Sequence, residues 1–256
     1  MEAAVLSLSG GMDSTSLLLH LLVRDFKVFA VSFNYGQKHG VELQRAKDNI
    51  AYLKKCGYPV QHTIIDLSIL GSLFNSALTS PEINIPEGHY ADDNMKATVV
   101  PNRNAIFASI VYGYALSLSK DYEETFIALG THSGDHLVYP DCRPEFQDAL
   151  EHAFKIGNWD SEKVSYYTPY INGDKFSILA DAVDACDTLG VYFNHVFENT
   201  STCYHPDALG RSCGKCGSCT ERVEAFVKLG WPDPIQYQEP YGDIERRVLD
   251  VLNQKK

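Results

Sequence analysis

The sequence predicts an α/β fold in which helices cover both faces of a parallel sheet. Over the first third of the chain, short apolar runs alternate with longer amphipathic segments. The resulting order of strand, helix, strand, helix and strand is typical of parallel sheets. A Gly-rich turn follows the first apolar run, at the carboxyl end of a strand, where open parallel sheets bind ligands. With 256 residues, the chain can bury a large core without disulfides.

The expected elements follow one another along the chain. Leucines at 17, 18, 21 and 22 lie on one side of the first helix, and Gly57 marks the end of the second. Apolar residues spaced by four indicate a long helix from Asn104. The expected strands are 3–8, 28–33, 60–67, 125–129 and 191–197. The expected helices are 14–24, 41–56, 104–119, 144–156, 175–189 and 221–229.

Two regions depart from this alternation. Residues 71–98 contain Pro81, Pro86 and Gly88 with charges between them, and we expect a loop or excursion there that could serve as a lid. From Asn199 the chain is rich in Cys and Gly. We therefore expect a main nucleotide-binding domain over residues 1–198 and a small C-terminal metal-binding element with a helical tail over residues 199–256.

Composition and charge limit the partners of the protein. The chain has 22 Lys and Arg against 33 Asp and Glu, a formal net charge of −11. This balance argues against an extended nucleic-acid surface or an anionic-lipid surface. The sequence contains neither a long apolar run nor a cationic leader at the N-terminus. We expect a cytoplasmic protein with no membrane partner and with reduced thiols.

The strongest local signal is the turn at residues 9–14, which reads S-G-G-M-D-S. Adjacent glycines allow close approach of the backbone to a ligand, and the following helix directs its free N–H groups into the turn. Asp13 would repel phosphate, so it is expected to hold Mg²⁺ or to cap the helix. The turn lacks the Gly-Lys-Ser/Thr ending of a Walker A loop. It resembles the PP-loop of the N-type ATP pyrophosphatases, although a plain Ser/Gly turn with an Asp cap would read similarly.

Four cysteines near the C-terminus form a second signal. Their spacing is Cys203-x9-Cys213-x2-Cys216-x2-Cys219, with glycines between the last three. Thiolates two residues apart in a Gly-rich turn can converge on one ion, and a fourth from an earlier segment closes a tetrahedral site. Four thiolates leave no open position, so a zinc ion here would be structural. A [4Fe–4S] cluster is the rival ligand.

Further motifs identify the chain as similar to one family. They are N-Y-G-Q-K-H at 34–39, P-N-R-N at 101–104, Y-P-D-C-R-P-E-F at 139–146, Thr168-Pro169 and Asp174-Lys175. Together with the S-G-G-M-D-S turn and the four cysteines, they resemble the 7-cyano-7-deazaguanine synthase family (QueC) over roughly residues 3–226. The tyrosine-to-arginine motif combined with the cysteine spacing is hard to place elsewhere among PP-loop enzymes.

The resemblance implies a definite reaction. ATP adenylates the carboxylate of 7-carboxy-7-deazaguanine and releases pyrophosphate, ammonia converts the mixed anhydride to an amide, and a second activation dehydrates the amide to the nitrile. The product serves queuosine or archaeosine synthesis. The family implies ATP, Mg²⁺ and Zn²⁺ as cofactors, small-molecule substrates and a homodimer.

The resemblance also implies roles for individual residues. Those expected to hold ATP and its Mg²⁺ are Leu8, Ser9, Gly10, Gly11, Met12, Asp13, Ser14, Thr15, Phe33, Tyr35 and Gln37. Those expected to contact the deazaguanine are Arg103, Asn104, Asp135, Tyr139, Asp141 and Arg143. Those expected to take part in the chemistry are Asp13, Arg103 and Lys175, the two cations because they can neutralise charge on the α-phosphate and the leaving pyrophosphate. The implied zinc ligands are Cys203, Cys213, Cys216 and Cys219.

Departures from the family pattern leave alternatives open. Leu137-Val138 stand where the family usually has Ser-Gly, and Asn102 stands where Gly is common. Because the first departure adjoins the expected base pocket, the acyl-adenylate could pass to another acceptor, giving an amide or a conjugate to a protein amine, as in an anti-phage system. A more remote alternative is a tRNA-modifying PP-loop enzyme, against which the net charge argues.

Overall fold

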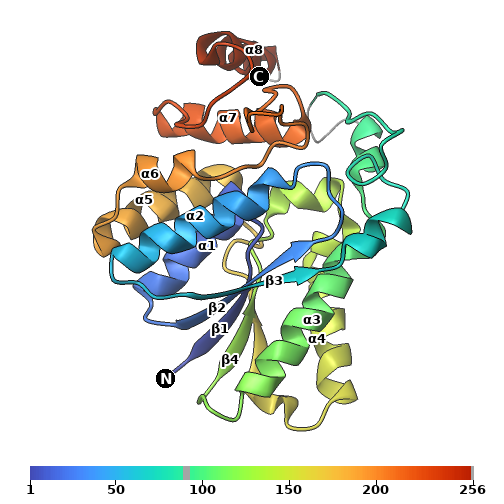
Figure 1. Cartoon of the computed structure of the whole chain (residues 1–256), viewed down its shortest axis with the longest axis vertical. Coiled ribbons are helices and arrows are strands. Elements are labelled where there is room, and N and C mark those ends of the chain that lie inside the picture. The colour runs from blue at the N-terminus through green and yellow to red at the C-terminus, as the bar shows by residue number, and fades with distance from the viewer. Residues whose placement is uncertain (89–92, 255–256) are drawn as a thin grey trace.

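In a computed structural model, which describes residues 1–88 and 93–254, the chain forms the expected α/β fold. Its sheet contains five parallel strands in the order β3-β2-β1-β4-β5. Figure 1 shows this sheet between two layers of helices. The strands are β1 Ala3–Ser7, β2 Lys27–Asn34, β3 Gln61–Asp66, β4 Thr125–Ala128 and β5 Val164–Tyr167.

The first strand lies at the centre of the sheet. Ala3 of β1 pairs with Lys27 of β2 on one side and with Thr125 of β4 on the other. The strand order therefore reverses between β1 and β4, which is where open α/β sheets bind ligands. Each residue of β1 from Ala3 to Leu6 is fully buried, because helices cover both faces of the sheet.

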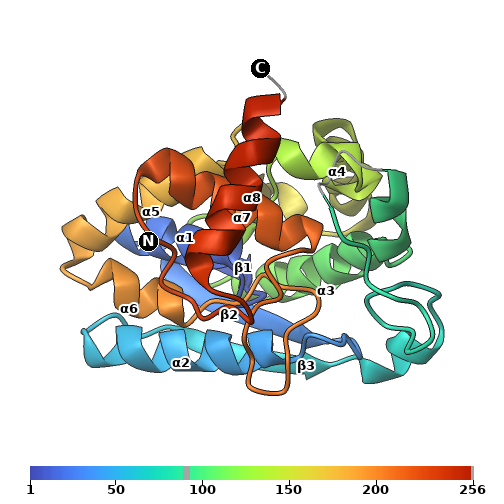
Figure 2. The same ribbon diagram turned by 90° about the horizontal axis from the view of Figure 1, so that it is seen from above.

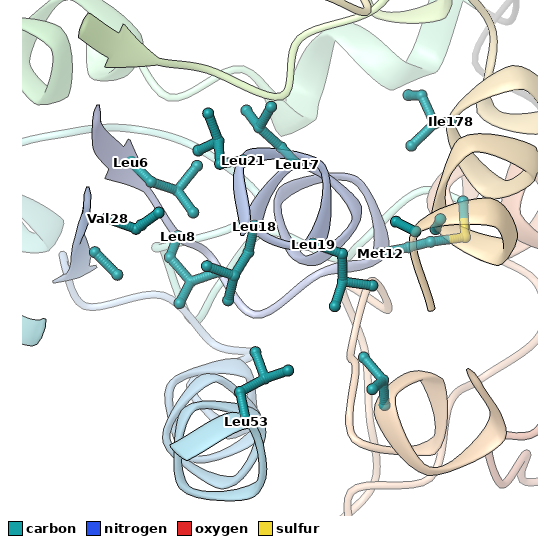
Figure 3. Packing of buried hydrophobic residues seen from close by; sticks show 14 of the residues in the cluster. Leu6, Leu8, Met12, Leu17, Leu18, Leu19, Leu21, Val28, Leu53 and Ile178 are labelled. Atoms are coloured by element: carbon teal, nitrogen blue, oxygen red, sulfur yellow. The ribbon is translucent and has the colours of Figure 1, made fainter. Parts of the chain in front are cut away.

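One face of the sheet packs on a leucine-rich helix. Leu6 and Val28 from the strands, Leu18 from α1 and Leu53 from α2 belong to one buried cluster, and Figure 3 shows Leu8 and Leu18 pointing toward each other. Each fully buried leucine stabilises the fold by about 1.5–3 kcal/mol through loss of apolar surface to water. The helices of this layer are α1 Met12–Val23, α2 Val41–Lys55, α5 Lys175–Leu189 and α6 Phe193–Glu198.

The other face is covered by α3 Arg103–Leu118 and α4 Pro144–Gly157 (Figure 1). Val5 and Val31 of the sheet and Val111 of α3 lie in this second buried cluster. Residues alternate between the two clusters along β1, as the period of a strand requires. The two layers thus leave the carboxyl edge of the sheet to be covered by other segments.

One predicted strand was wrong, and one strand of the sheet was missed. Residues 191–197 do not form the last strand, because Phe193–Glu198 is helix α6; there Phe193 stacks on Phe197, four residues on, with ring centroids 4.2 Å apart. The fifth strand is instead β5, a segment that was not predicted. The polar end of the chain contains helix α8 Tyr241–Gln254, which falls within the expected helical tail, although the bounds of this helix were not predicted.

The C-terminal segment lies above the carboxyl edge of the sheet. Helix α7 Gly217–Leu229 extends the helix expected at 221–229, and α8 packs on it (Figures 1 and 2). Val223 of α7 and Ile244 of α8 form a small buried cluster with the four cysteines, whereas Phe226 of α7 belongs to the main core. The C-terminal element is therefore joined to the main domain through α7.

The described residues of the expected excursion, 71–88 and 93–98, include the end of a short 3-10 helix at Ser68–Ser72 and a second one at Asp93–Thr98. The predicted lid includes residues 89–92, which lie outside the described residues. Glu87 and Cys216 form an isolated antiparallel bridge, so this excursion reaches the C-terminal element. Among the helices of residues 1–88 and 93–254, none is long and apolar enough to cross a membrane.

Candidate active site

The S-G-G-M-D-S turn connects β1 to α1 in a conformation that needs its first glycine. Gly10 has a positive φ of 88°, and a Cβ there would lie 2.1 Å from the carbonyl oxygen of Glu42. Helix α1 begins at Met12, so the unpaired N–H groups of its first turn face back into this turn. The hydroxyls of Ser9 and Ser14 lie 3.0 Å apart. The turn therefore has the geometry of an anion site.

A cavity lies beside this turn, at the carboxyl ends of β1, β2 and β4. Its walls come from the S-G-G-M-D-S turn at residues 9–14, called the phosphate turn below, and from the ends of these strands. The N-terminal part of α3 and part of the C-terminal element complete them. The sequence-predicted residues that line it are Leu8, Ser9, Gly11, Asp13, Ser14, Phe33, Tyr35, Arg103, Asn104, Asp135, Tyr139, Asp141 and Lys175.

The ammonium of Lys175 lies among acidic side chains at the start of α5. Lys175 Nζ is 2.8 Å from Asp13 Oδ2 and 3.2 Å from Glu221 Oε2, and it is 3.0 Å from His132 Nε2. Burial alone would lower the lysine pKa, but Asp13, Glu221 and Asp135 outweigh it, and the pKa is raised. Lys175 is therefore charged at neutral pH.

Asp13 is ionised for the complementary reason. Burial alone would raise its pKa, but the neighbouring Lys175 and His132 outweigh that effect and lower it. Its second oxygen, Oδ1, is buried and has no hydrogen-bond partner within the described part of the chain. A buried carboxylate oxygen without a partner, beside a turn with the geometry of an anion site, is a suitable ligand for Mg²⁺.

Asp141 occupies the opposite side of the cavity with one oxygen engaged. Its Oδ2 accepts from the backbone N–H of Asn104 at 3.4 Å, in the first turn of α3. Its Oδ1 is buried and, among the described residues, lacks a hydrogen-bond partner. The second oxygen is thus left to accept from a ligand in the cavity.

A cluster of polar side chains continues the cavity wall along β2 and α2. Gln37 Nε2 donates to Glu42 Oε1 at 3.0 Å, and His39 Nε2 lies 3.5 Å from the hydroxyl of Tyr35. Burial lowers the pKa of His39 to about 3 and raises that of Glu42 to about 8. Both groups are therefore largely uncharged near neutral pH, and this part of the wall carries little charge of its own.

The four cysteines of the C-terminal element converge on one point. All are buried, and their sulfur atoms lie within 4.8 Å of one another, with Cys213 and Cys219 sulfurs 3.9 Å apart. Tetrahedral Zn–S bonds of about 2.3 Å place sulfurs about 3.8 Å apart. Backbone N–H groups of His205 and Cys213 donate to the sulfur of Cys203. The donor set fits a single metal ion.

Comparison of the chain with known proteins shows which family it belongs to. The model of the family described as "Queuosine biosynthesis protein QueC" matches residues 3–230. The chain belongs to the QueC family. Curated relatives include the 7-cyano-7-deazaguanine synthase 2 of Colwellia psychrerythraea and the 7-cyano-7-deazaguanine synthase of a Marinomonas species, each 44% identical over 238 residues. That stretch covers 93% of this chain and 99% of each relative.

A further relative of this QueC-family chain has a similar level of identity. The 7-cyano-7-deazaguanine synthase of Methanoregula boonei is 41% identical over 235 residues, 92% of this chain and 99% of the relative. Among solved structures, an NMN synthetase from Francisella tularensis aligns with 99% of this chain and 78% of its own, at 15% identity and a TM-score of 0.42. A likeness that slight bears on neither the site nor the activity.

Five of the ATP-site and substrate-site residues predicted for this QueC-family chain do not line the cavity. Met12 is buried in the core, and Gln37 supports the wall by bonding to Tyr35, Phe33 and Glu42. Arg143 donates to the carbonyl of His136 at 3.0 Å and does not line the cavity. The predicted residues outside the cavity lining are Gly10, Met12, Thr15, Gln37 and Arg143.

The cavity of the QueC-family chain also contains residues that the sequence analysis missed. Glu42 and His39 belong to it, and so do Ser201, Thr202 and Tyr204 from the C-terminal element. His39 stands in the N-Y-G-Q-K-H motif, and Tyr204 directly follows the first cysteine. These two signals could have identified His39 and Tyr204. Glu42 lies in a helix whose sequence contains no recognisable motif.

Proposed function

We propose that the chain is a 7-cyano-7-deazaguanine synthase that uses ATP to convert 7-carboxy-7-deazaguanine to the nitrile. The support comes from similarity to synthases of that name over 93% of this chain, together with one cavity that is lined by the phosphate turn and by residues from four of the five further family motifs. The substrate carboxylate attacks the α-phosphorus of ATP and displaces pyrophosphate. Ammonia then attacks the acyl carbon, AMP leaves, and the amide forms.

The second half of the reaction uses the same groups. The amide oxygen attacks the α-phosphorus of a second ATP and displaces pyrophosphate, and loss of AMP with two protons leaves the nitrile. In both halves, Ser9, Ser14 and the first turn of α1 bind the phosphates. Lys175 and Arg103 line the cavity and neutralise charge that develops on the α-phosphate and the leaving pyrophosphate. Phe33 and Tyr35 border the adenosine.

The deazaguanine would bind between the phosphate turn and α3. Asp141 Oδ1 can accept from the ring N–H and the exocyclic amine of a guanine-like base. Tyr139, whose hydroxyl lies 2.7 Å from the hydroxyl of Thr98, offers an aromatic face for stacking. Asp135 lines the same side of the cavity. Because Arg143 is bonded to the His136 carbonyl, we leave it out of the base pocket.

Mg²⁺ and Zn²⁺ would occupy different places. Asp13 Oδ1 would hold the Mg²⁺ that accompanies ATP, which screens phosphate charge. The four cysteines would hold Zn²⁺ as a structural ion. A [4Fe–4S] cluster is less suitable, because four irons and four sulfides between the cysteines would hold their sulfur atoms farther apart than a single ion does.

The alternatives have less support. The relatives described above carry the synthase name, and none of them bears a name that indicates another acceptor, an anti-phage role or tRNA modification. A protein amine as acceptor and a homodimer are expectations that neither the cavity nor these relatives address. The net charge of −11 still argues against an extended tRNA-binding face.

Mass spectrometry would test the proposal directly. The protein is incubated with ATP, Mg²⁺ and 7-carboxy-7-deazaguanine, with and without ammonium. We expect AMP, pyrophosphate and the nitrile when ammonium is present, and no nitrile without it. AMP formation that depends on the acid but yields no nitrile, or a mass shift on the protein, would point to another acceptor. ATP cleavage that ignores the acid would contradict the proposal.

A further inference from the structure

Two segments of the C-terminal element reach the phosphate turn, and each contains a metal-ligating cysteine. Residues 201–204 surround Cys203, and their Ser201, Thr202 and Tyr204 line the cavity. Residues 218–221 surround Cys219, and Ser218 lines the cavity too. The backbone N–H of Ser201 donates to the carbonyl of Gly10 at 2.9 Å. The element thus contacts the phosphate turn directly.

The second segment also supplies a charged partner to the active site. Glu221 Oε2 lies 3.2 Å from Lys175 Nζ, and the Glu221 side chain is 14% exposed. The contact is an ion pair that is not aligned as a hydrogen bond. The other oxygen, Oε1, lies over Gly134, where an added Cβ would be 2.3 Å away. The carboxylate is therefore held between α5 and the turn at 132–135.

Lys175 faces charged or titratable groups from three directions. Asp13 comes from α1 at 2.8 Å, Glu221 from α7 at 3.2 Å, and His132 from the loop after β4 at 3.0 Å, while Asp135 adds its charge from the same loop. A lysine side chain has many rotamers and one compact charge. With Asp13 alone, the ammonium would pair with the carboxylate that Mg²⁺ needs. Glu221 is a second carboxylate within 3.2 Å of the same ammonium, and it divides that attraction.

We propose that Glu221 is a positioning residue: together with Asp13 it fixes the Lys175 ammonium beside the phosphate turn, so that the four-cysteine element completes the ATP site. The proposal rests on the proposed function insofar as Lys175 is taken to meet the phosphates of ATP. Glu221 itself lies outside the cavity lining and acts through the lysine. The metal-binding element is thereby part of the catalytic apparatus as well as a folding unit.

Calorimetric titration of the full chain with MgATP tests this without the deazaguanine. Four proteins are compared: wild type, Glu221→Gln, Lys175→Met and the double variant. We expect Glu221→Gln to weaken MgATP binding about tenfold and the double variant to bind no more weakly than Lys175→Met, since residues that act through one another are not additive. Glu221→Asp should recover part of the loss.

Whether Glu221→Gln weakens or strengthens MgATP binding distinguishes a positioning role from simple charge repulsion. Glu221 is an acid near a polyanion site, so without a positioning role its removal would strengthen MgATP binding. Stronger binding, or a loss that adds fully to that of Lys175→Met, would overturn the proposal. Glu239→Gln is the matched control, because Glu239 also pairs with a lysine of the element, Lys215 at 2.7 Å, away from the cavity.

Two further measurements separate the possible failures. Metal content and the thermal unfolding midpoint of Glu221→Gln should equal those of wild type, which excludes collapse of the element as the cause. If wild type binds MgATP but does not turn over the deazaguanine acid, the proposed function fails and the positioning result still stands. If wild type does not bind MgATP, both proposals are overturned.

Discussion

Asp13 and Glu42 are both buried beside the same cavity, yet their pKa values move in opposite directions. Asp13 faces the Lys175 ammonium, whose attraction outweighs the effect of burial, and its pKa is lowered. Glu42 is hydrogen-bonded to neutral Gln37, so burial dominates and raises its pKa to about 8. The partner that each residue meets decides its charge. One acid is available to a metal ion, and the other is a mostly neutral part of the wall.

Glu42 should give the stability of the protein a measurable pH dependence. Its pKa is about 8 in the folded chain against a reference of 4.5, so between these values the unfolded chain loses the proton first. The free energy of unfolding then falls as pH rises, at up to about 1.4 kcal/mol per pH unit from this group. We expect Glu42→Gln to gain stability relative to wild type, on the order of 3 kcal/mol, from about pH 5.5 to about pH 8.

Urea unfolding at several pH values measures this difference. Glu145→Gln serves as the control, because Glu145 is exposed on the surface of α4. A difference between Glu42→Gln and wild type that stays constant over the whole range would show that Glu42 ionises normally in the folded protein.

Asp141 is expected to govern recognition of the base. Replacement of Asp141 by Asn keeps the shape but puts an amide N–H₂ or a weaker acceptor where the unpaired carboxylate oxygen lies. We expect the KM for 7-carboxy-7-deazaguanine to rise about tenfold or more, because hydrogen bonds to a charged group contribute roughly 1.5–3 kcal/mol. The KM for ATP should stay unchanged.

Steady-state kinetics with each substrate varied in turn test this split. Asp148→Asn on the exposed side of α4 is the control and should behave as wild type. An equal rise in both KM values would mean that Asp141 does not recognise the base. Its role would then be to support the whole cavity through its hydrogen bond with the first turn of α3.

Among the secondary-structure elements, local sequence patterns predicted four of the five strands of the sheet. They failed where tertiary packing determines whether a segment becomes a strand or a helix. The apolar run at 191–197 suits a strand, but Phe193, Val196 and Phe197 have helical spacing, and Val196 and Phe197 are buried. Strand β5 has four residues, of which one is buried and three are half-buried. Its hydrophobic pattern in the sequence is therefore weak. Helix α8 is polar overall, and its apolar stripe, with Ile244 and Val248 spaced by four, was overlooked.

The candidate site shows the same limit. The phosphate turn, Arg103, Lys175 and the cysteines were predicted because each belongs to a motif with its own chemistry. Glu221 was not singled out, since its importance comes from the approach of α7 to α5, which the sequence does not display. Arg143 was assigned to the base by its motif, but the structure directs it to the carbonyl of His136.

Helix α8 should control access to the cysteine cluster. Ile244 is fully buried, and a Cβ at Gly214, between two of the cysteines, would lie 2.5 Å from it. Replacing Ile244 by Ala would remove buried contacts worth about 2–5 kcal/mol. We expect a several-fold faster transfer of the bound metal to a chelator.

A colorimetric chelator assay follows that transfer over time. Leu249→Ala on the same helix is the control, since Leu249 is 38% exposed. Equal metal-release rates for the two variants would show that α8 does not shield the cysteines.

Over the whole molecule, the cysteine cluster joins regions that are distant in sequence. Ser201 next to Cys203 bonds to the phosphate turn, and Glu221 beyond Cys219 pairs with α5. Removing the metal ion should free both segments, because metal binding and local folding are coupled. We therefore expect the metal-free protein to unfold at a lower temperature and to lose MgATP binding, with Zn²⁺ restoring both.

Calorimetry before and after chelation, and again after addition of Zn²⁺, provides the measurement. Addition of Mg²⁺ in place of Zn²⁺ is the control and should restore neither property. Metal-free protein that still binds MgATP with unchanged affinity would show that the cysteine element is dispensable for the ATP site.

The bond from Ser201 to Gly10 and the ion pair from Glu221 to Lys175 also bear on when the protein becomes active during its synthesis. The ribosome releases the phosphate turn well before the two cysteine segments, and domains begin to fold as they emerge. A nascent chain can therefore complete its parallel sheet while the ATP site still lacks one wall. The ATP site is therefore complete only after the segments around Cys203 and Cys219 have packed against the sheet.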